Sequence, residues 1–283
     1  MTVSQALRQA EQRLREAGVP DPALDAERLL RHVLGWDRAA VITRAADALP
    51  APEQKRFFSL VDERAARRPL QHLTGTQAFW RHDFVVSADV LIPRPETEIL
   101  VEAALEAMRD LAAPVVVDVG TGSGCVALSL AAERADAVVH AVDASAAALA
   151  VAAENALRLG LPGRVELHEG DLLEPVARLR GAVHLVVSNP PYVDPSEIPS
   201  LASEVRDHEP RSALVAPQPP YGIYERLAAQ AVETLRPGGR LLVEVGRGMA
   251  DGVAARLGVA GLVGIETRLD LAGVARVVSG RRP

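Results

Sequence analysis

A glycine-rich run near the middle of the chain could bind a ligand. The run Asp118-Val119-Gly120-Thr121-Gly122-Ser123-Gly124 follows a valine-rich segment and precedes a helical pattern that begins near Cys125. Glycines at such a turn let the backbone approach a ligand closely, and the first N–H groups of the helix favour an anionic or polar group. A tight strand-to-helix turn without a ligand has the same pattern, so the run alone is a weak signal.

Two further positions fit a nucleoside. Asp143 lies 23 residues after Gly120, at the end of the next predicted strand, where a carboxylate can hold both hydroxyls of a ribose. Asp171 and Leu172 follow the third predicted strand, where an adenine would rest against the leucine. A solvated aspartate and a helix-capping aspartate are the alternatives. Together with the glycine run, these residues predict either a dinucleotide or S-adenosylmethionine as ligand.

The tetrad Asn189-Pro190-Pro191-Tyr192 follows the fourth predicted strand. It favours S-adenosylmethionine over a dinucleotide as the predicted ligand. A planar amide or aromatic amine nitrogen is a poor nucleophile because its lone pair is delocalised. An enzyme that alkylates it must hold the nitrogen in line with the alkyl group and accept hydrogen bonds from its N–H groups. Asn189 offers a side-chain carbonyl and Pro190 a backbone carbonyl without an N–H, and Tyr192 offers a flat wall. A plain proline turn is the alternative. We predict Asn189, Pro190 and Tyr192 as catalytic residues, with Pro191 also binding substrate.

The surrounding elements predict an α/β fold. Short runs rich in valine and leucine alternate with helical patterns, which is typical of a parallel sheet with helices on both faces. The last two runs are joined by a turn too short for a helical crossover, which predicts a terminal antiparallel hairpin. The predicted strands are 115–119, 138–142, 165–168, 183–188, 241–245, 262–267 and 274–278.

Three regions are expected along the chain. Apolar residues recur at helical spacing before residue 69, which predicts a small all-helical domain over residues 1–75. Residues 76–95 contain two short strand patterns and are expected to form a linking β-hairpin. Residues 96–283 carry the alternating pattern and all the candidate site residues.

Composition narrows the class of partner. The chain of 283 residues has 31 Lys and Arg against 37 Asp and Glu, a net charge of −6, which disfavours direct binding to DNA. The single cysteine forms no internal disulfide, and the seven histidines show no spacing typical of zinc, so no metal ligand is predicted. No uncharged run approaches the roughly 18 residues that cross a bilayer. A cytoplasmic protein without membrane contact is expected.

At these motifs the sequence resembles the peptide chain release factor glutamine methyltransferases, the HemK or PrmC family of N5-glutamine methyltransferases. The resemblance spans nearly the whole chain, and its most specific part is the run Ile92-Pro93-Arg94-Pro95-Glu96-Thr97-Glu98. Further matches are 69–75 with Phe79-Trp80, 118–124, Val142-Asp143, 189–192, Glu209-Pro210, 237–239, 244–246 and 270–278.

The resemblance implies a class I S-adenosylmethionine-dependent methyltransferase fold, Rossmann-like, with a mostly parallel seven-stranded sheet behind a helical N-terminal domain. It implies S-adenosyl-L-methionine as cofactor and the glutamine of the Gly-Gly-Gln loop of release factors as substrate. Residues 120–124, Asp143 and Asn189 would contact the cofactor, and 189–192 would grip the glutamine amide. Two positions depart from the family: Leu172 stands where an aromatic residue is usual, and 216–222 replaces a common glycine-rich stretch.

Two other functions are compatible with parts of the sequence. An adenine-N6 or guanine-N2 methyltransferase of nucleic acids binds its substrate amine with a similar Asn-Pro-Pro-aromatic motif. The sequence shows neither the basic surface nor the target-recognition domain expected of such an enzyme. A non-catalytic module that docks a translation factor would be expected to have a broken glycine run or tetrad, and both are intact.

Overall fold

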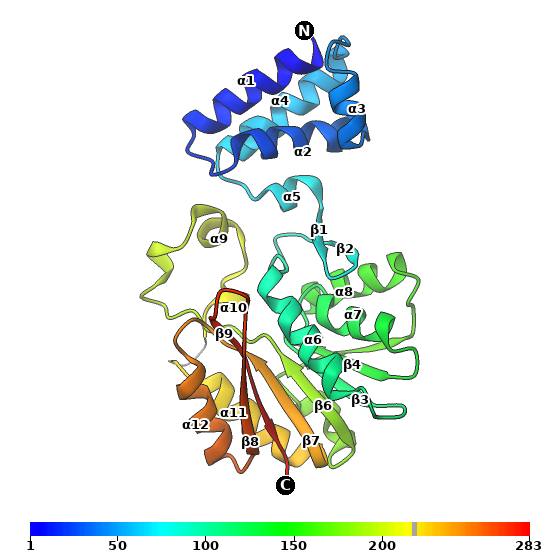
Figure 1. Ribbon diagram of the computed structural model, residues 1–283, viewed down its shortest axis with the longest axis vertical. Helices are drawn as coiled ribbons and strands as arrows, with labels where there is room; N and C mark the ends of the chain where they lie inside the picture. Colours follow the sequence, from blue (N-terminus) through cyan, green and yellow to red (C-terminus); the bar gives the residue numbers. More distant parts are fainter. Residues whose placement is uncertain (217–219) are drawn as a thin grey trace. The chain divides into compact units, whose positions relative to one another are not determined.

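The computed structural model describes residues 1–216 and 220–283, which the backbone contacts group into two units. The first unit holds residues 1–76 and 202–208, and the second holds residues 77–201 and 209–283 (Figure 1). No sequence pattern had placed 202–208 with the helical unit. Three residues of the divergent 216–222 stretch, 217–219, lie outside the described residues.

The second unit is built on a seven-stranded sheet in the order β5-β4-β3-β6-β7-β9-β8. The first five of these strands are parallel, whereas β9 runs antiparallel to both β7 and β8. The predicted parallel sheet with a terminal antiparallel hairpin is therefore confirmed. The strands are β3 (Val115–Val119), β4 (Val138–Asp143), β5 (Val165–Glu169), β6 (Val183–Ser188), β7 (Leu235–Glu244), β8 (Val263–Leu269) and β9 (Ala275–Arg281).

Strand β7 begins six residues earlier than predicted, because Leu235 already pairs with Val183 of β6 before the pairing resumes at Arg240. The register between β6 and β7 shifts there, between Val183 and Leu185. A Cβ at Gly239 would lie 2.9 Å from the Val183 carbonyl oxygen, so only glycine lets the two strands approach this closely.

Helices cover both faces of the sheet, as the alternating pattern predicted. Val116 belongs to the core under α6 (Glu98–Ala107), α7 (Cys125–Glu133) and α8 (Ala146–Arg158). Its neighbour Val117 belongs to the opposite core, under α11 (Gly222–Thr234) and α12 (Ala250–Val259). The shorter elements of this unit are β1 (Thr76–Phe79), β2 (His82–Val85), η1 (Pro95–Thr97), η2 (Glu174–Leu179), η3 (Ile198–Ser200) and α10 (Arg211–Leu214).

The first unit is helical. The side chains of Leu14, Leu30 and Phe57 are fully buried in its core, and Thr2 forms a capping box with Gln5 at the first helix. Its helices are α1 (Val3–Glu16), α2 (Pro22–Leu34), α3 (Arg38–Thr43), α4 (Ala51–Ala65), α5 (Leu70–Thr74) and α9 (Ser203–His208). In the described parts of the chain, no helix combines the length and apolar character needed to span a bilayer.

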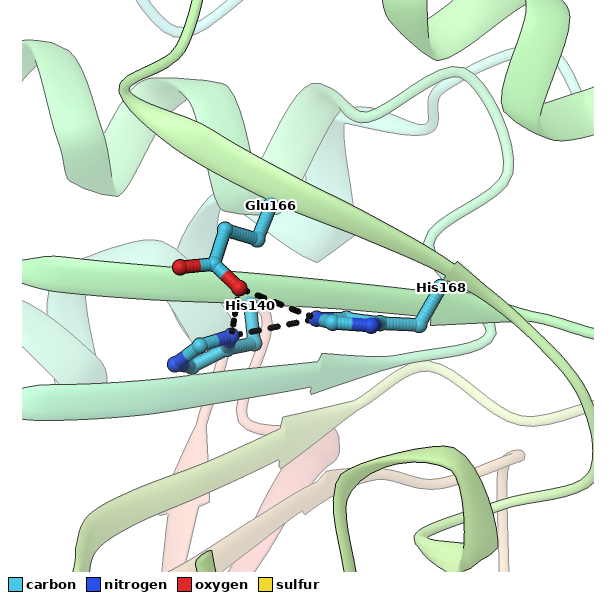
Figure 2. A group of neighbouring side chains, drawn as sticks. All are labelled: His140, Glu166 and His168. Atoms are coloured by element: carbon cyan, nitrogen blue, oxygen red, sulfur yellow. Dashed lines mark hydrogen bonds and ion pairs between the residues drawn. The ribbon is translucent and has the colours of Figure 1, made fainter. Parts of the chain in front are cut away.

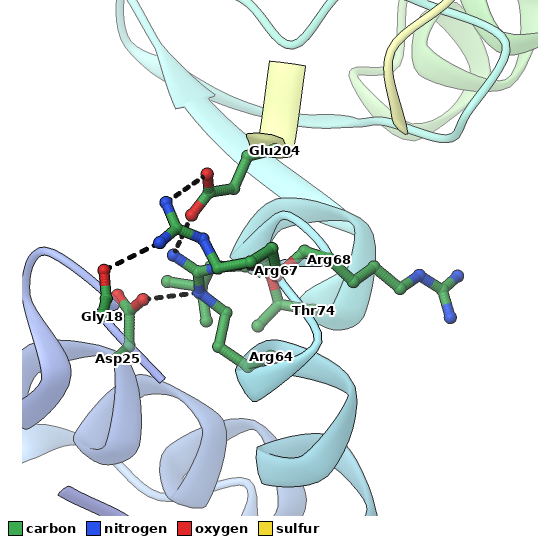
Figure 3. Close-up of polar contacts among 8 residues, drawn as sticks. Gly18, Asp25, Arg64, Arg67, Arg68, Thr74 and Glu204 are labelled. Carbon is green, nitrogen blue, oxygen red and sulfur yellow. Dashed lines mark hydrogen bonds and ion pairs between the residues drawn. The ribbon is translucent and has the colours of Figure 1, made fainter. Parts of the chain in front are cut away.

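A buried cluster of charges joins α9 to the other helices of this unit (Figure 3). Arg64 donates from Nε to Asp25 Oδ2 at 2.7 Å and from Nη2 to Glu204 Oε1 at 2.9 Å. Arg67 donates to the other Glu204 oxygen at 2.7 Å and to the Gly18 carbonyl at 2.7 Å. The Arg64 side chain is only 6% exposed, so its charge depends on these two carboxylates.

Replacing Glu204 is expected to destabilise the first unit. Glu204→Gln removes the charge shared by two arginines, and we expect a loss of about 1–3 kcal/mol in the free energy of unfolding. Trp36 lies in this unit and Trp80 does not, so urea unfolding followed by fluorescence in a Trp80→Phe background monitors it selectively. Glu11→Gln, which removes an exposed pair with Arg15, is the matched control. Equal losses in both variants would contradict the importance of the buried cluster.

Candidate active site

A cavity of about 630 Å³ opens at the carboxyl ends of β3, β4 and β6. The glycine run and the tetrad meet there, because Val119 and Ser188 are register partners and Ser188 Oγ donates to the Val119 carbonyl at 2.8 Å. Among the predicted site residues, only Gly124 and Tyr192 are not part of the described lining. Those that line it are Gly120, Thr121, Gly122, Ser123, Asp143, Asp171, Leu172, Asn189, Pro190 and Pro191.

The glycine run forms a loop tied to the end of β4. Gly120 and Thr121 donate their backbone N–H groups to the Val142 carbonyl at 2.8 and 3.0 Å. Gly120 and Gly122 have φ angles of 71° and 56°, which favour glycine. A Cβ at Gly124 would lie 3.0 Å from Leu128 and 3.2 Å from the Ala152 side chain. This third glycine therefore lets α7 pack against α8.

Asp118 holds the glycine loop through hydrogen bonds, a role that could not be assigned from the sequence. It is buried and accepts hydrogen bonds from Thr121 Oγ1 at 2.6 Å and from the Ala127 N–H at 3.1 Å. The carboxylate thus connects the loop to the first turn of α7. Burial raises the pKa of Asp118 to about 7.

Asp143 stands where the sequence predicted a ribose ligand. Its Oδ2 accepts the Gly122 N–H at 2.8 Å, and its Oδ1 accepts the Ser145 N–H at 2.9 Å. Each carboxylate oxygen keeps lone-pair capacity for a second donor. These two hydrogen bonds hold the carboxylate in a fixed orientation on the cavity wall. Both of its oxygens can still accept hydrogen bonds from a ligand.

Leu172 and Asp171 form another part of the wall. Leu172 is buried with a φ of 49°, an unusual conformation for a side-chain-bearing residue. The next residue, Leu173, donates its N–H to Gln230 at 2.8 Å, and Asp171 forms an ion pair with Arg226 of α11. These contacts fix the loop so that the wall presents an apolar side chain.

Asn189 is oriented by a residue from the Ile92–Glu98 run. Its Nδ2 donates to Thr97 Oγ1 at 3.2 Å, and Thr97 is buried. Thr97 also lies beside the buried carboxyl of Glu244 and moderates the rise that burial causes in its pKa. The hydroxyl oxygen of Thr97 accepts from the asparagine NH2 group. Among the described residues no donor is bonded to Asn189 Oδ1.

Thr97 occupies the N-cap position of α6, where threonine commonly caps a helix. The Thr97 side chain makes no capping hydrogen bond in the structure. The signal that could have identified its role is the unusual specificity of the run itself, because nothing in a helix start requires that order of residues.

Glu209 holds the preceding residues of the same run. It is buried and accepts from Arg94 Nη2 at 2.6 Å and from the Ile92 N–H at 3.3 Å. Arg94 lines the cavity. The Glu209-Pro210 motif and the Ile92–Glu98 run, 115 residues apart, therefore form one wall.

Tyr192, the last residue of the tetrad, packs its ring beside Gly246 and Met249. A Cβ at Gly246 would lie 3.0 Å from Tyr192 Cδ2 and 2.9 Å from the Met249 sulfur, so the glycine makes room for the ring. Burial, with the nearby Glu244, raises the pKa of Tyr192 to about 12. The phenol is thus protonated at neutral pH and acts as a packed ring.

The chain is similar to proteins of one family along its full length. Residues 5–75 match the model of the PrmC N-terminal domain, and residues 94–206 match that of the methyltransferase small domain. The release factor glutamine methyltransferase of Cereibacter sphaeroides is 44% identical over 100% of this chain and 99% of the relative. The protein of the same name from Deinococcus radiodurans is 43% identical, with the same coverage.

A solved structure gives the same similarity at the sequence level. The protein-(glutamine-N5) methyltransferase (release factor-specific) of Alicyclobacillus acidocaldarius is 31% identical over 70% of this chain and 99% of that chain, with a TM-score of 0.42. The match to the methyltransferase small domain agrees with the fold that the sequence predicted.

The buried carboxyl of Glu244 predicts a pH dependence of stability. Burial raises its pKa from an ordinary value of 4.5 to about 7, so the unfolded chain releases this proton first as the pH rises. The wild type should therefore lose stability relative to Glu244→Gln between about pH 4.5 and 7, by at most about 3 kcal/mol.

Urea unfolding at several pH values, followed by Trp80 fluorescence in a Trp36→Phe background, measures this difference. The difference between the two proteins should be constant above pH 7. A constant difference across the whole range would show that Glu244 titrates normally.

Proposed function

Because this chain belongs to the family of release factor glutamine methyltransferases, we propose that it methylates the Gly-Gly-Gln glutamine of peptide chain release factors with S-adenosylmethionine. The observation that carries the proposal is the orientation of Asn189. Its NH2 group is bonded to Thr97, and its carbonyl oxygen is left at a cavity shared with the glycine loop and Asp143. We propose a cytoplasmic location as well, because release factors act together with the translation machinery.

The residues around the cavity fit S-adenosylmethionine. The volume of about 630 Å³ lies within the range of about 300–1,000 Å³ found for small-molecule sites. Asp143 would accept the ribose hydroxyls, the loop of residues 120–123 would lie against the amino acid portion, and Leu172 with Asp171 would border the adenine. The bound cofactor supplies an electrophilic methyl group on a sulfonium sulfur.

The tetrad would hold the substrate amide. An amide nitrogen is a poor nucleophile because its lone pair is delocalised, so alignment matters more than acid–base chemistry. Asn189 Oδ1 and the Pro190 carbonyl would accept the two N–H groups of the glutamine and fix the plane of its amide. These hydrogen bonds strengthen as the nitrogen becomes positive, which favours the transition state.

Positioning accounts for the rest of the catalysis. Holding two reactants in line contributes about 7–11 kcal/mol in well-oriented intramolecular reactions. The proton becomes acidic only after the nitrogen is methylated and can then pass to water, so no strong base is needed. The half-buried ring of Tyr192 packs against Gly246 and would hold the end of the tetrad in place.

A methyl-transfer assay with labelled S-adenosylmethionine tests the function. The purified chain is incubated with a release factor, with the same factor carrying Gln→Ala in its Gly-Gly-Gln loop, and with DNA or RNA. Label in the unmodified release factor alone supports the proposal. Label in nucleic acid would instead identify an amino-methyltransferase of bases.

Thr97 should act as a positioning residue for Asn189. We expect Thr97→Val to reduce kcat by about 10–100-fold with a smaller change in KM, because the asparagine amide loses the partner that fixes its orientation. Thr97→Ser keeps the hydroxyl and should restore most of the rate. Asn189→Ala is the benchmark and should reduce turnover by roughly 100-fold or more. Equal rates for the Val and Ser variants would contradict the positioning role.

Asp143→Ala should weaken cofactor binding rather than the chemical step. The lost hydrogen bonds to a charged group correspond to about 1.5–3 kcal/mol, or roughly 10–100-fold in the Kd for S-adenosylmethionine. Calorimetry with S-adenosylmethionine measures the change, and circular dichroism checks that the loop variant is folded. Asp143→Asn, which keeps one acceptor oxygen, should bind with intermediate affinity. An unchanged Kd in both variants would argue against the ribose assignment.

A further inference from the structure

We propose that His140, Glu166 and His168 form a binding site for a divalent transition-metal ion of the zinc type (Figure 2). His140 lies on β4, and the other two residues lie on the adjacent edge strand β5. None of the three lines the cavity of the candidate active site. The proposal is therefore independent of the proposed methyl transfer.

The distances between the three possible ligand atoms fit one ion. His140 Nδ1 lies 3.1 Å from His168 Nε2 and 3.5 Å from Glu166 Oε2, and the last two atoms are 3.8 Å apart. Two ligands that each lie about 2.0–2.1 Å from a tetrahedral zinc ion are about 3.3 Å from one another. Small side-chain movements would bring all three atoms to bonding distance.

The backbone holds these side chains on one face of the sheet. His140 and Glu166 are register partners, and His168 follows Glu166 by two residues on the same strand. Paired strands give a rigid base, and Figure 2 shows the two rings and the carboxylate pointing toward one another. The spacing of these residues in the sequence gave no such signal, because the pairing of two strands creates the cluster.

The donor set suits zinc. Two imidazole nitrogens and one carboxylate oxygen are ligands that zinc commonly uses, with a fourth position left for water or another ligand. Burial lowers the pKa of both histidines, so each ring has an uncharged nitrogen to offer at neutral pH. His140 is almost fully buried, whereas the Glu166 side chain is 55% exposed and leaves an open side.

Arg178 of η2 competes with an ion at this site. Its Nη2 donates to the same Glu166 oxygen at 2.7 Å, so a bound ion would have to displace it or share that oxygen. The Arg178 side chain is 57% exposed and can turn into solvent at little cost. Removing it should therefore strengthen metal binding.

The place of the cluster in the fold suggests what a bound ion would do. His168 lies two residues before Gly170, where the loop carrying Asp171 and Leu172 begins. An ion shared by β4 and β5 would fix the edge strand to its neighbour and stabilise this part of the second unit. Its effect should appear first in thermal stability.

The test uses tag-free protein and Zn²⁺ alone, in competition with a chromophoric chelator. We expect one equivalent to bind per chain and to raise the melting temperature. Co²⁺ in its place should give the intense visible absorption of a four-coordinate site without thiolate charge transfer. Failure of the wild type to bind either ion would overturn the proposal.

Variants then locate the site. His168→Gln and Glu166→Gln should each weaken Zn²⁺ binding by at least about tenfold. The Glu166 side chain is 55% exposed and that of His168 only 14%, so Glu166→Gln is the variant that disturbs the fold least, and circular dichroism checks the fold of both. Arg178→Ala should strengthen binding several-fold. His32→Gln, which changes an exposed histidine of α2, and Arg180→Ala, which removes a neighbouring arginine paired with Glu233, are matched controls. Undiminished binding in both ligand variants would place the ion elsewhere and contradict the proposal.

Discussion

The hydrogen bond from Asn189 Nδ2 to Thr97 Oγ1 decides which end of the asparagine amide is left for a ligand. Without this bond the side chain could present either its NH2 group or its carbonyl oxygen to the cavity. Thr97 Oγ1 accepts this hydrogen bond, so the asparagine NH2 group is taken up and its carbonyl oxygen is left for a ligand. A substrate amide needs acceptors, so this orientation is the one that the proposed mechanism requires.

The wall around Asn189 is assembled from motifs that are far apart in the sequence. In the Ile92–Glu98 run, Thr97 accepts a hydrogen bond from Asn189, and Arg94 donates one to Glu209. Glu96 Oε1 of the same run lies 3.5 Å from Arg276 Nη2 of β9. Most of these contacts are buried or half-buried, where an unpaired charge is costly. The mutual dependence of these contacts explains why the run has a specific order that no helix start would need.

Much of the fold and of the cavity could be predicted from the sequence, since both follow from local patterns. The alternation of valine-rich runs with helical patterns predicted the sheet, and the ends of its strands placed the glycine loop beside Asn189. Contacts across elements could not be predicted in this way. The partner of Thr97, the ring of Tyr192 packed against Gly246, and the place of residues 202–208 in the first unit all depend on packing between distant segments.

Two buried carboxyls, Asp118 and Glu244, lie near the cavity. Their ionisation lowers the stability of the second unit, but their positions help to hold the residues around the cavity. Burial raises the pKa of each to about 7, which means that ionising them in the folded protein is costly. Asp118 accepts the hydrogen bonds that join the glycine loop to α7, and Glu244 lies beside Thr97. The cluster of His140, Glu166 and His168 on β4 and the edge strand β5 lies outside this arrangement. An ion bound there would offset part of that cost without entering the cavity.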